Sequence, residues 1–93
     1  MAQWKEVHKE GHRLRLLCKP ANLGARDCEL LILALVENNS WRVQNIVRVH
    51  VTAGAVNIEI DHYRPEEIAK QIRNLVDAND AFAEPPTGES PNA

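Results

Sequence analysis

The 93-residue sequence lacks an excess of charge of either sign, since 11 basic and 13 acidic residues give a net charge of −2 and the basic residues form no run. Nucleic-acid-binding domains usually concentrate Lys and Arg on one surface. Aromatic residues are also scarce, with two Trp, one Tyr and one Phe, so few rings are present on which bases could stack. The composition therefore argues against a nucleic-acid partner.

Long apolar runs and a cysteine framework are missing as well. No stretch approaches the roughly 18 apolar residues of a transmembrane helix, and the start, MAQWKEVHKE, lacks the apolar segment of a signal peptide. We therefore expect a cytoplasmic protein with no membrane insertion. The two cysteines, Cys18 and Cys28, are too few for a disulfide scaffold and should remain thiols in a reducing compartment.

Motifs that carry catalytic chemistry are absent too. The sequence contains no serine nucleophile elbow, no glycine-rich phosphate loop and no Cys or His in a context that indicates nucleophile activation. We therefore expect that the protein is not an enzyme.

The length of the chain suits one small domain. Residues 81–93, AFAEPPTGESPNA, are rich in Pro, Gly, Ser and small residues and have no apolar periodicity, which predicts a disordered tail. Residues 13–80 are expected to form the folded domain. The pattern of residues 1–12 leaves their structure undetermined.

Alternation of apolar and polar residues predicts three strands. RLRLLC (residues 13–18) alternates cleanly at its start and should be a half-buried strand. VRVHVTAGAVNIEID (residues 47–61) alternates through two runs joined by Ala53-Gly54, where Gly54 tolerates a positive φ. The second and third strands should therefore form a hairpin that buries its Val and Ile face.

Helical spacing predicts two helices, one in CELLILALVE (residues 28–37) and one in RPEEIAKQIRNLVDAN (residues 64–79), where Pro65 suits the first helical turn. The order strand, helix, strand, strand, helix predicts an α+β sandwich in which two helices cover one face of an antiparallel sheet. A right-handed crossover would place the first strand beside the third, so that the last strand is central.

Two segments, RVHVTAGAVNIEID and PEEIAKQI, resemble the second half of heavy-metal-associated domains, and the likeness covers about residues 13–76. The opening VHKEGHRLRL is similar to the start of a divergent branch of that family without the metal loop. The resemblance implies a ferredoxin-like fold and, in metal-trafficking members, a Cys-x-x-Cys loop that binds a soft monovalent metal. This chain has no Cys-x-x-Cys, so the resemblance indicates an HMA-like domain that lacks the metal motif.

Cys18 and Cys28 flank the loop in which those family cysteines lie, and two thiolates could bind Cu(I). The strand and helix patterns, however, turn both side chains inward, where free Cys acts as a small buried hydrophobe. His8 and His12 have a spacing that zinc can use on a helix, but Gly11 opposes a helix there. A carrier of metal or metallocofactor that uses Cys18, Cys28 and His8 or His12 to hold Cu(I) or Zn(II) is therefore the alternative hypothesis.

The main hypothesis is a non-enzymatic, ferredoxin-like module that contacts a protein partner and needs no cofactor. The polar side of the hairpin and of the preceding strand should form a flat surface made of Arg15, Leu17, Arg48, His50, Asn57 and Glu59. Arg48 falls opposite Glu59 in the expected register, which predicts a cross-strand ion pair. A solvated sheet surface without any partner is the simpler interpretation.

The first predicted helix is apolar nearly all round, because Leu30 and Leu33 lie off its main apolar face. Exposed apolar surface often marks association. Either the N-terminal segment around Trp4 covers these leucines or a second copy of the chain does. We favour a homodimer with Leu30, Leu33 and Trp41 as its contacts.

Overall fold

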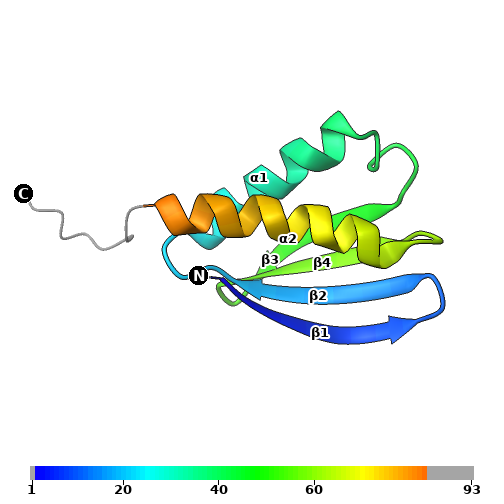
Figure 1. Cartoon of the computed structure of the whole chain (residues 1–93), viewed down its shortest axis with the longest axis horizontal. Helices are drawn as coiled ribbons and strands as arrows, with labels where there is room; N and C mark the ends of the chain where they lie inside the picture. Colours follow the sequence, from blue (N-terminus) through cyan, green and yellow to red (C-terminus); the bar gives the residue numbers. More distant parts are fainter. Residues whose placement is uncertain (1, 84–93) are drawn as a thin grey trace, which may run out of the picture.

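The computed structural model describes residues 2–83 and contains one four-stranded antiparallel sheet and two helices (Figure 1). The elements are β1 (Gln3–Glu10), β2 (Arg13–Lys19), α1 (Ala25–Asn38), β3 (Val47–Thr52), β4 (Ala55–Asp61) and α2 (Pro65–Phe82). The strand order is β1-β2-β4-β3. This arrangement confirms the predicted α+β class and is compatible with a ferredoxin-like sandwich.

The central part of the sheet has the register that the alternation predicts. Val51 pairs with Val56 and Val47 pairs with Ile60, so the hairpin closes at Ala53-Gly54. Both turn residues have positive φ, 54° and 77°. Such a two-residue turn follows the right-handed twist of its strands. β2 pairs with β4 on the other side, which places β4 inside the sheet as expected.

The core lies between the sheet and the two helices, which cover the same face of the sheet (Figure 1). α1 packs mainly on β3 and β4, and α2 packs on β4 and β2. The buried residues include the inward positions of both patterns: Leu14, Leu16, Cys18, Cys28, Ile32, Val36, Val47, Val56, Ile58, Ile60, Ile68, Ile72 and Val76. Each large aliphatic side chain removed from water contributes about 1.5–3 kcal/mol, so these stripes hold the layers together.

The segment Gln3–Glu10 forms an additional edge strand, β1, which the sequence pattern did not indicate. It pairs antiparallel with β2 from Gln3 to Glu10, with a bulge between Glu6 and His8. Trp4 is its only partly buried residue, and the others are exposed. Because β1 buries so little apolar surface, its residues show no alternation from which a strand could be predicted.

Side chains of β1 also reach α2. The indole Nε1–H of Trp4 donates to Asp77 Oδ1 at 2.9 Å, and the Arg73 guanidinium lies 5.8 Å from the centroid of the indole. Lys9 and Glu66 form an ion pair at the other end of the strand. The edge strand is therefore attached to the second helix as well as to β2.

The loop between β2 and α1 is held by Asp80, near the C-terminal end of α2. The backbone N–H groups of Ala21, Asn22 and Leu23 donate to its carboxylate at 3.1, 2.8 and 2.8 Å. Burial opposes ionisation of Asp80, but these hydrogen bonds outweigh it and keep the pKa of the carboxyl below its ordinary value. One charged side chain thus connects the end of α2 to the start of α1.

The predicted disordered tail, residues 81–93, lies mostly outside the described residues. α2 continues through Phe82, two residues past the expected end of the domain at position 80. Residues 84–93 of the predicted tail are not described.

Candidate functional site

The sheet face opposite the helices, here called the open face, carries all six residues predicted to meet a partner. Pairing in the sheet aligns Arg15, Glu59 and Arg48 across β2, β4 and β3. The next row aligns Leu17, Asn57 and His50. β1 extends the two rows with His8 and Lys5, whose positions sequence reasoning missed because β1 has no strand signal.

A hollow of about 310 Å³ borders the first row. Its charged lining includes Arg13, Arg15, Arg48, Glu59 and Asp61. The end of β4 and the segment that precedes β3 close it at one side. The hollow is therefore a shallow, charged depression in the open face and has little apolar surface with which to bury a small molecule.

The predicted ion pair between Arg48 and Glu59 is wrong, although the two residues are paired in the register as expected. Among the described residues, neither Arg48 nor Arg15 has an ion pair with Glu59 within 4.0 Å. At the end of β4, an ion pair joins Arg13 Nε to Asp61 Oδ2 at 3.7 Å. Long Arg side chains on a flat surface gain little from an exposed pair, because ordering them costs side-chain entropy. Arg15 and Arg48 thus leave two guanidinium groups available to a partner.

The two cysteines meet in the core. Cys18 of β2 and Cys28 of α1 are both fully buried and both are free thiols. A hydrogen bond with Cys28, reinforced by burial, raises the pKa of the Cys18 thiol. The same hydrogen bond lowers the pKa of Cys28, because the Cys18 S–H stabilises a thiolate there. The inward orientation predicted from both patterns is what the structure shows.

The structure does not bring the four candidate metal ligands together. His8 lies on the open face, opposite Arg15, and His12 lies in the turn between β1 and β2, whereas the cysteines are in the core. Within residues 2–83, no group of three or more His, Cys, Asp or Glu side chains has an arrangement that could hold a metal ion.

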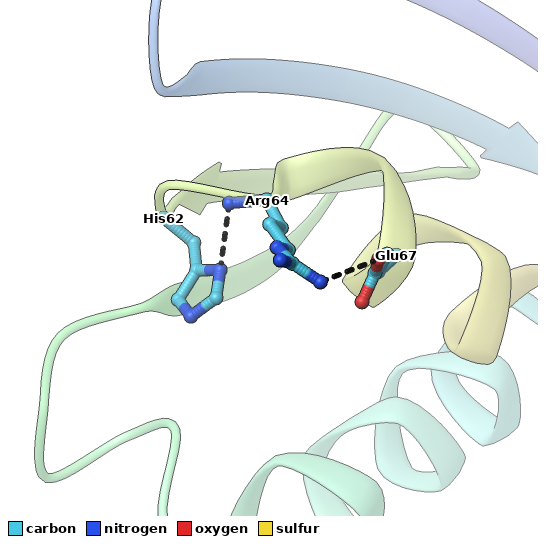
Figure 2. A network of polar contacts seen from close by, with 3 residues as sticks. All are labelled: His62, Arg64 and Glu67. Atoms are coloured by element: carbon cyan, nitrogen blue, oxygen red, sulfur yellow. Dashed lines mark hydrogen bonds and ion pairs between the residues drawn. The ribbon is translucent and has the colours of Figure 1, made fainter.

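The start of α2 contains a second polar network, which Figure 2 shows. The backbone N–H of Arg64 donates to His62 Nδ1 at 3.0 Å, and the Arg64 guanidinium lies 3.3 Å from Glu67 Oε2. The His62 ring also lies 4.3 Å from that of Tyr63. None of these residues lines the hollow in the open face. The network orders the junction between β4 and α2, where α2 has no side-chain cap.

The three expected dimer contacts lie in different environments. Leu30 is 49% exposed, Leu33 is partly buried, and Trp41 is only 8% exposed and belongs to the core. The Trp41 side chain is therefore not available on the surface of the monomer. Trp4 donates to Asp77 of α2, so the N-terminal segment is attached to the second helix.

Comparisons with protein-family models, with curated proteins and with solved structures found no match to this chain. The likeness to heavy-metal-associated domains therefore stays a prediction. Among residues 2–83, neither helix combines the length and the apolar composition that a membrane span requires.

Proposed function

We propose that this protein is a non-enzymatic binding module that contacts a protein partner through the open face of its sheet. The observation that carries this proposal is the pair of aligned rows on that face, in which Arg15 and Arg48 flank Glu59 without an ion pair to it. Arginine is enriched at the energetic centres of protein interfaces, because its fixed fork of donors can hydrogen-bond several acceptors at once.

The second row supplies a different kind of contact. Leu17, Asn57 and His50 place an apolar, an amide and an imidazole side chain beside the charged row. A partner could thus bury a small apolar area while it pairs with the arginines, a combination typical of non-obligate interfaces.

The size of the face sets the expected strength of binding. Four strands at about 4.8 Å spacing are about 19 Å wide, and six residues at about 3.4 Å extend about 20 Å, which gives a projected area of about 400 Å². A standard interface buries about 800 Å² on each partner. We therefore propose that one face alone binds its protein partner transiently in the cytoplasm. We also propose that the module acts as a homodimer, which joins two such faces.

The alternative function, a metal or metallocofactor carrier, gains no supporting observation from the geometry. Cys18 and Cys28 lie within the core, and His8 and His12 lie elsewhere. A thiol pair in the core would need the β2–α1 loop to open before a metal could reach it.

Affinity capture with the full chain, followed by quantitative mass spectrometry, tests the proposal. The wild type is compared with Arg48→Glu and with Lys70→Glu, a matched charge reversal on the exposed surface of α2. We expect a protein that the wild type and the Lys70 variant capture equally and that the Arg48 variant captures at least about tenfold less, since each factor of ten requires only about 1.4 kcal/mol. Circular dichroism must show that both variants fold. A captured set that Arg48→Glu leaves unchanged contradicts the proposal.

A further inference from the structure

The two edges of the sheet differ in how they are protected against pairing. β1, at one edge, carries Lys and Glu side chains and a bulge between Glu6 and His8. Charged residues and bulges are the usual means by which edge strands avoid other strands. β3, at the opposite edge, is VRVHVT and pairs with β4 in a continuous register without a bulge. Only the β3 edge is therefore suited to accept another strand.

The hydrogen-bonding groups of β3 alternate in direction. The Asp61 N–H donates to the Ile46 carbonyl at 2.8 Å, which places residues 46 and 61 at a hydrogen-bonded position of the antiparallel ladder, although the Ile46 N–H donates to the Trp41 carbonyl instead. Such pairs alternate with non-hydrogen-bonded ones. The N–H and C=O groups of Val47, Val49 and Val51 therefore point away from β4, toward the free edge.

We infer that a second copy of this chain pairs with the β3 edge, β3 against β3 and antiparallel, so that the two sheets become one. This inference deepens the homodimer named in the proposed function by giving it an interface. With Val49 opposite Val49 of the second copy, Val47 falls opposite Val51, and all of the outward backbone groups find partners. Val51, which is 37% exposed in the monomer, is then covered by valine.

The charges of β3 are compatible with pairing to itself. In this register Arg48 lies opposite His50 of the second copy, so no arginine lies directly opposite an arginine. Like charges directly opposite each other would destabilise a strand pair, so this strand can accept its own copy where a more basic strand could not.

The symmetry of the pair places both open faces on the same side. Two antiparallel edge strands are related by a twofold axis perpendicular to the sheet, and this axis keeps each face on its own side. The joined sheet has eight strands, twice the four of one copy, and its open face is doubled to about 800 Å² of projected area. The doubled face is therefore large enough for a standard interface, in which each partner buries about 800 Å² of accessible surface.

Light scattering with size-exclusion chromatography tests the inference. Protein concentrations up to about 1 mM allow a dimer with a Kd as weak as about 1 mM to be detected. The wild type should approach twice the 10.5 kDa mass of the chain as concentration rises. Val51→Lys should weaken the dimer by about tenfold or more. Val7→Lys replaces an exposed valine of β1, at the other edge, and should leave the dimer unchanged. Affinity capture with the monomeric Val51→Lys variant distinguishes the two proposals. If that variant still captures the partner, the open face binds the partner without the β3 interface.

Hydrogen exchange on the wild type provides a second measurement that needs no variant. The amides of Val49 and Val51 should exchange about tenfold more slowly when the protein is concentrated enough to dimerise. The inference is overturned if the wild type is monomeric at about 1 mM. It is also overturned if Val7→Lys dissociates the dimer while Val51→Lys does not, or if amide exchange at Val49 is unchanged in the dimer.

Discussion

Replacement of Asp80 by Ala should remove a large part of the stability of this protein. The carboxylate is fully buried and accepts hydrogen bonds from the backbone N–H groups of Ala21, Asn22 and Leu23. Ala21 is exposed and Asn22 and Leu23 are partly buried, so each lost hydrogen bond should cost about 1 kcal/mol, the net contribution of a typical one. For the three bonds together, Asp80→Ala should lower the free energy of unfolding by about 3 kcal/mol.

That loss is large compared with the total. A chain of this length is expected to have an unfolding free energy of about 5–14 kcal/mol. Asp80→Asn keeps the shape of the side chain and one carbonyl oxygen but loses the charge that strengthens these bonds. It should therefore fall between the wild type and Asp80→Ala, at a loss of about 1–2 kcal/mol.

Urea unfolding followed by circular dichroism measures these differences. Asp61→Asn is the matched control, because the Asp61 side chain is exposed and makes a single ion pair, to Arg13 at 3.7 Å. Its cost should stay below about 0.5 kcal/mol. If Asp80→Ala unfolds within about 0.5 kcal/mol of the wild type, the three hydrogen bonds do not hold the loop and the reasoning is refuted.

The pH dependence gives an independent check on the same residue. Because folding lowers the pKa of Asp80, the stability from its charge is fully present above the ordinary carboxyl pKa of about 3.9 and is lost as the pH falls through the lower folded value. The difference in urea midpoint between the wild type and Asp80→Asn should therefore shrink below about pH 4. A difference that is constant from neutral to acid pH would show that ionisation of Asp80 contributes nothing.

Two further predictions concern the edge strand and the thiols. Trp4→Phe removes the donor to Asp77 but keeps an aromatic ring, so it should destabilise the protein by about 1 kcal/mol. It should also speed amide exchange in β1 more than in the β3–β4 hairpin. A uniform change of exchange across the sheet would contradict a role of Trp4 in holding β1. Cys18 and Cys28 are fully buried, so a thiol-specific aromatic disulfide should label neither in the native protein and both in urea. Rapid labelling of either cysteine before unfolding would show that the β2–α1 region opens readily.

Sequence pattern alone predicted the middle of this fold well. Alternation is a local property that reports which side of a strand is buried, so the β3–β4 register and the central position of β4 followed from residues 47–61 and 13–18. The helical stripes and the inward orientation of Cys18 and Cys28 followed in the same way. The six residues of the open face share a side of the sheet for the same reason.

The tertiary structure decided what depends on distant segments. β1 buries almost nothing, so only its pairing with β2 shows that it is a strand. The contacts of Trp4 with Asp77 and of Asp80 with Ala21 join residues 73 and 59 positions apart. No local pattern encodes such contacts, because each side chain meets its partner only after the helices have packed on the sheet. The absence of an ion pair between Arg48 and Glu59 has a similar cause. Register sets which backbones are neighbours, but whether the two charges pair depends on whether the carboxylate is solvated by water or by a guanidinium whose ordering costs side-chain entropy.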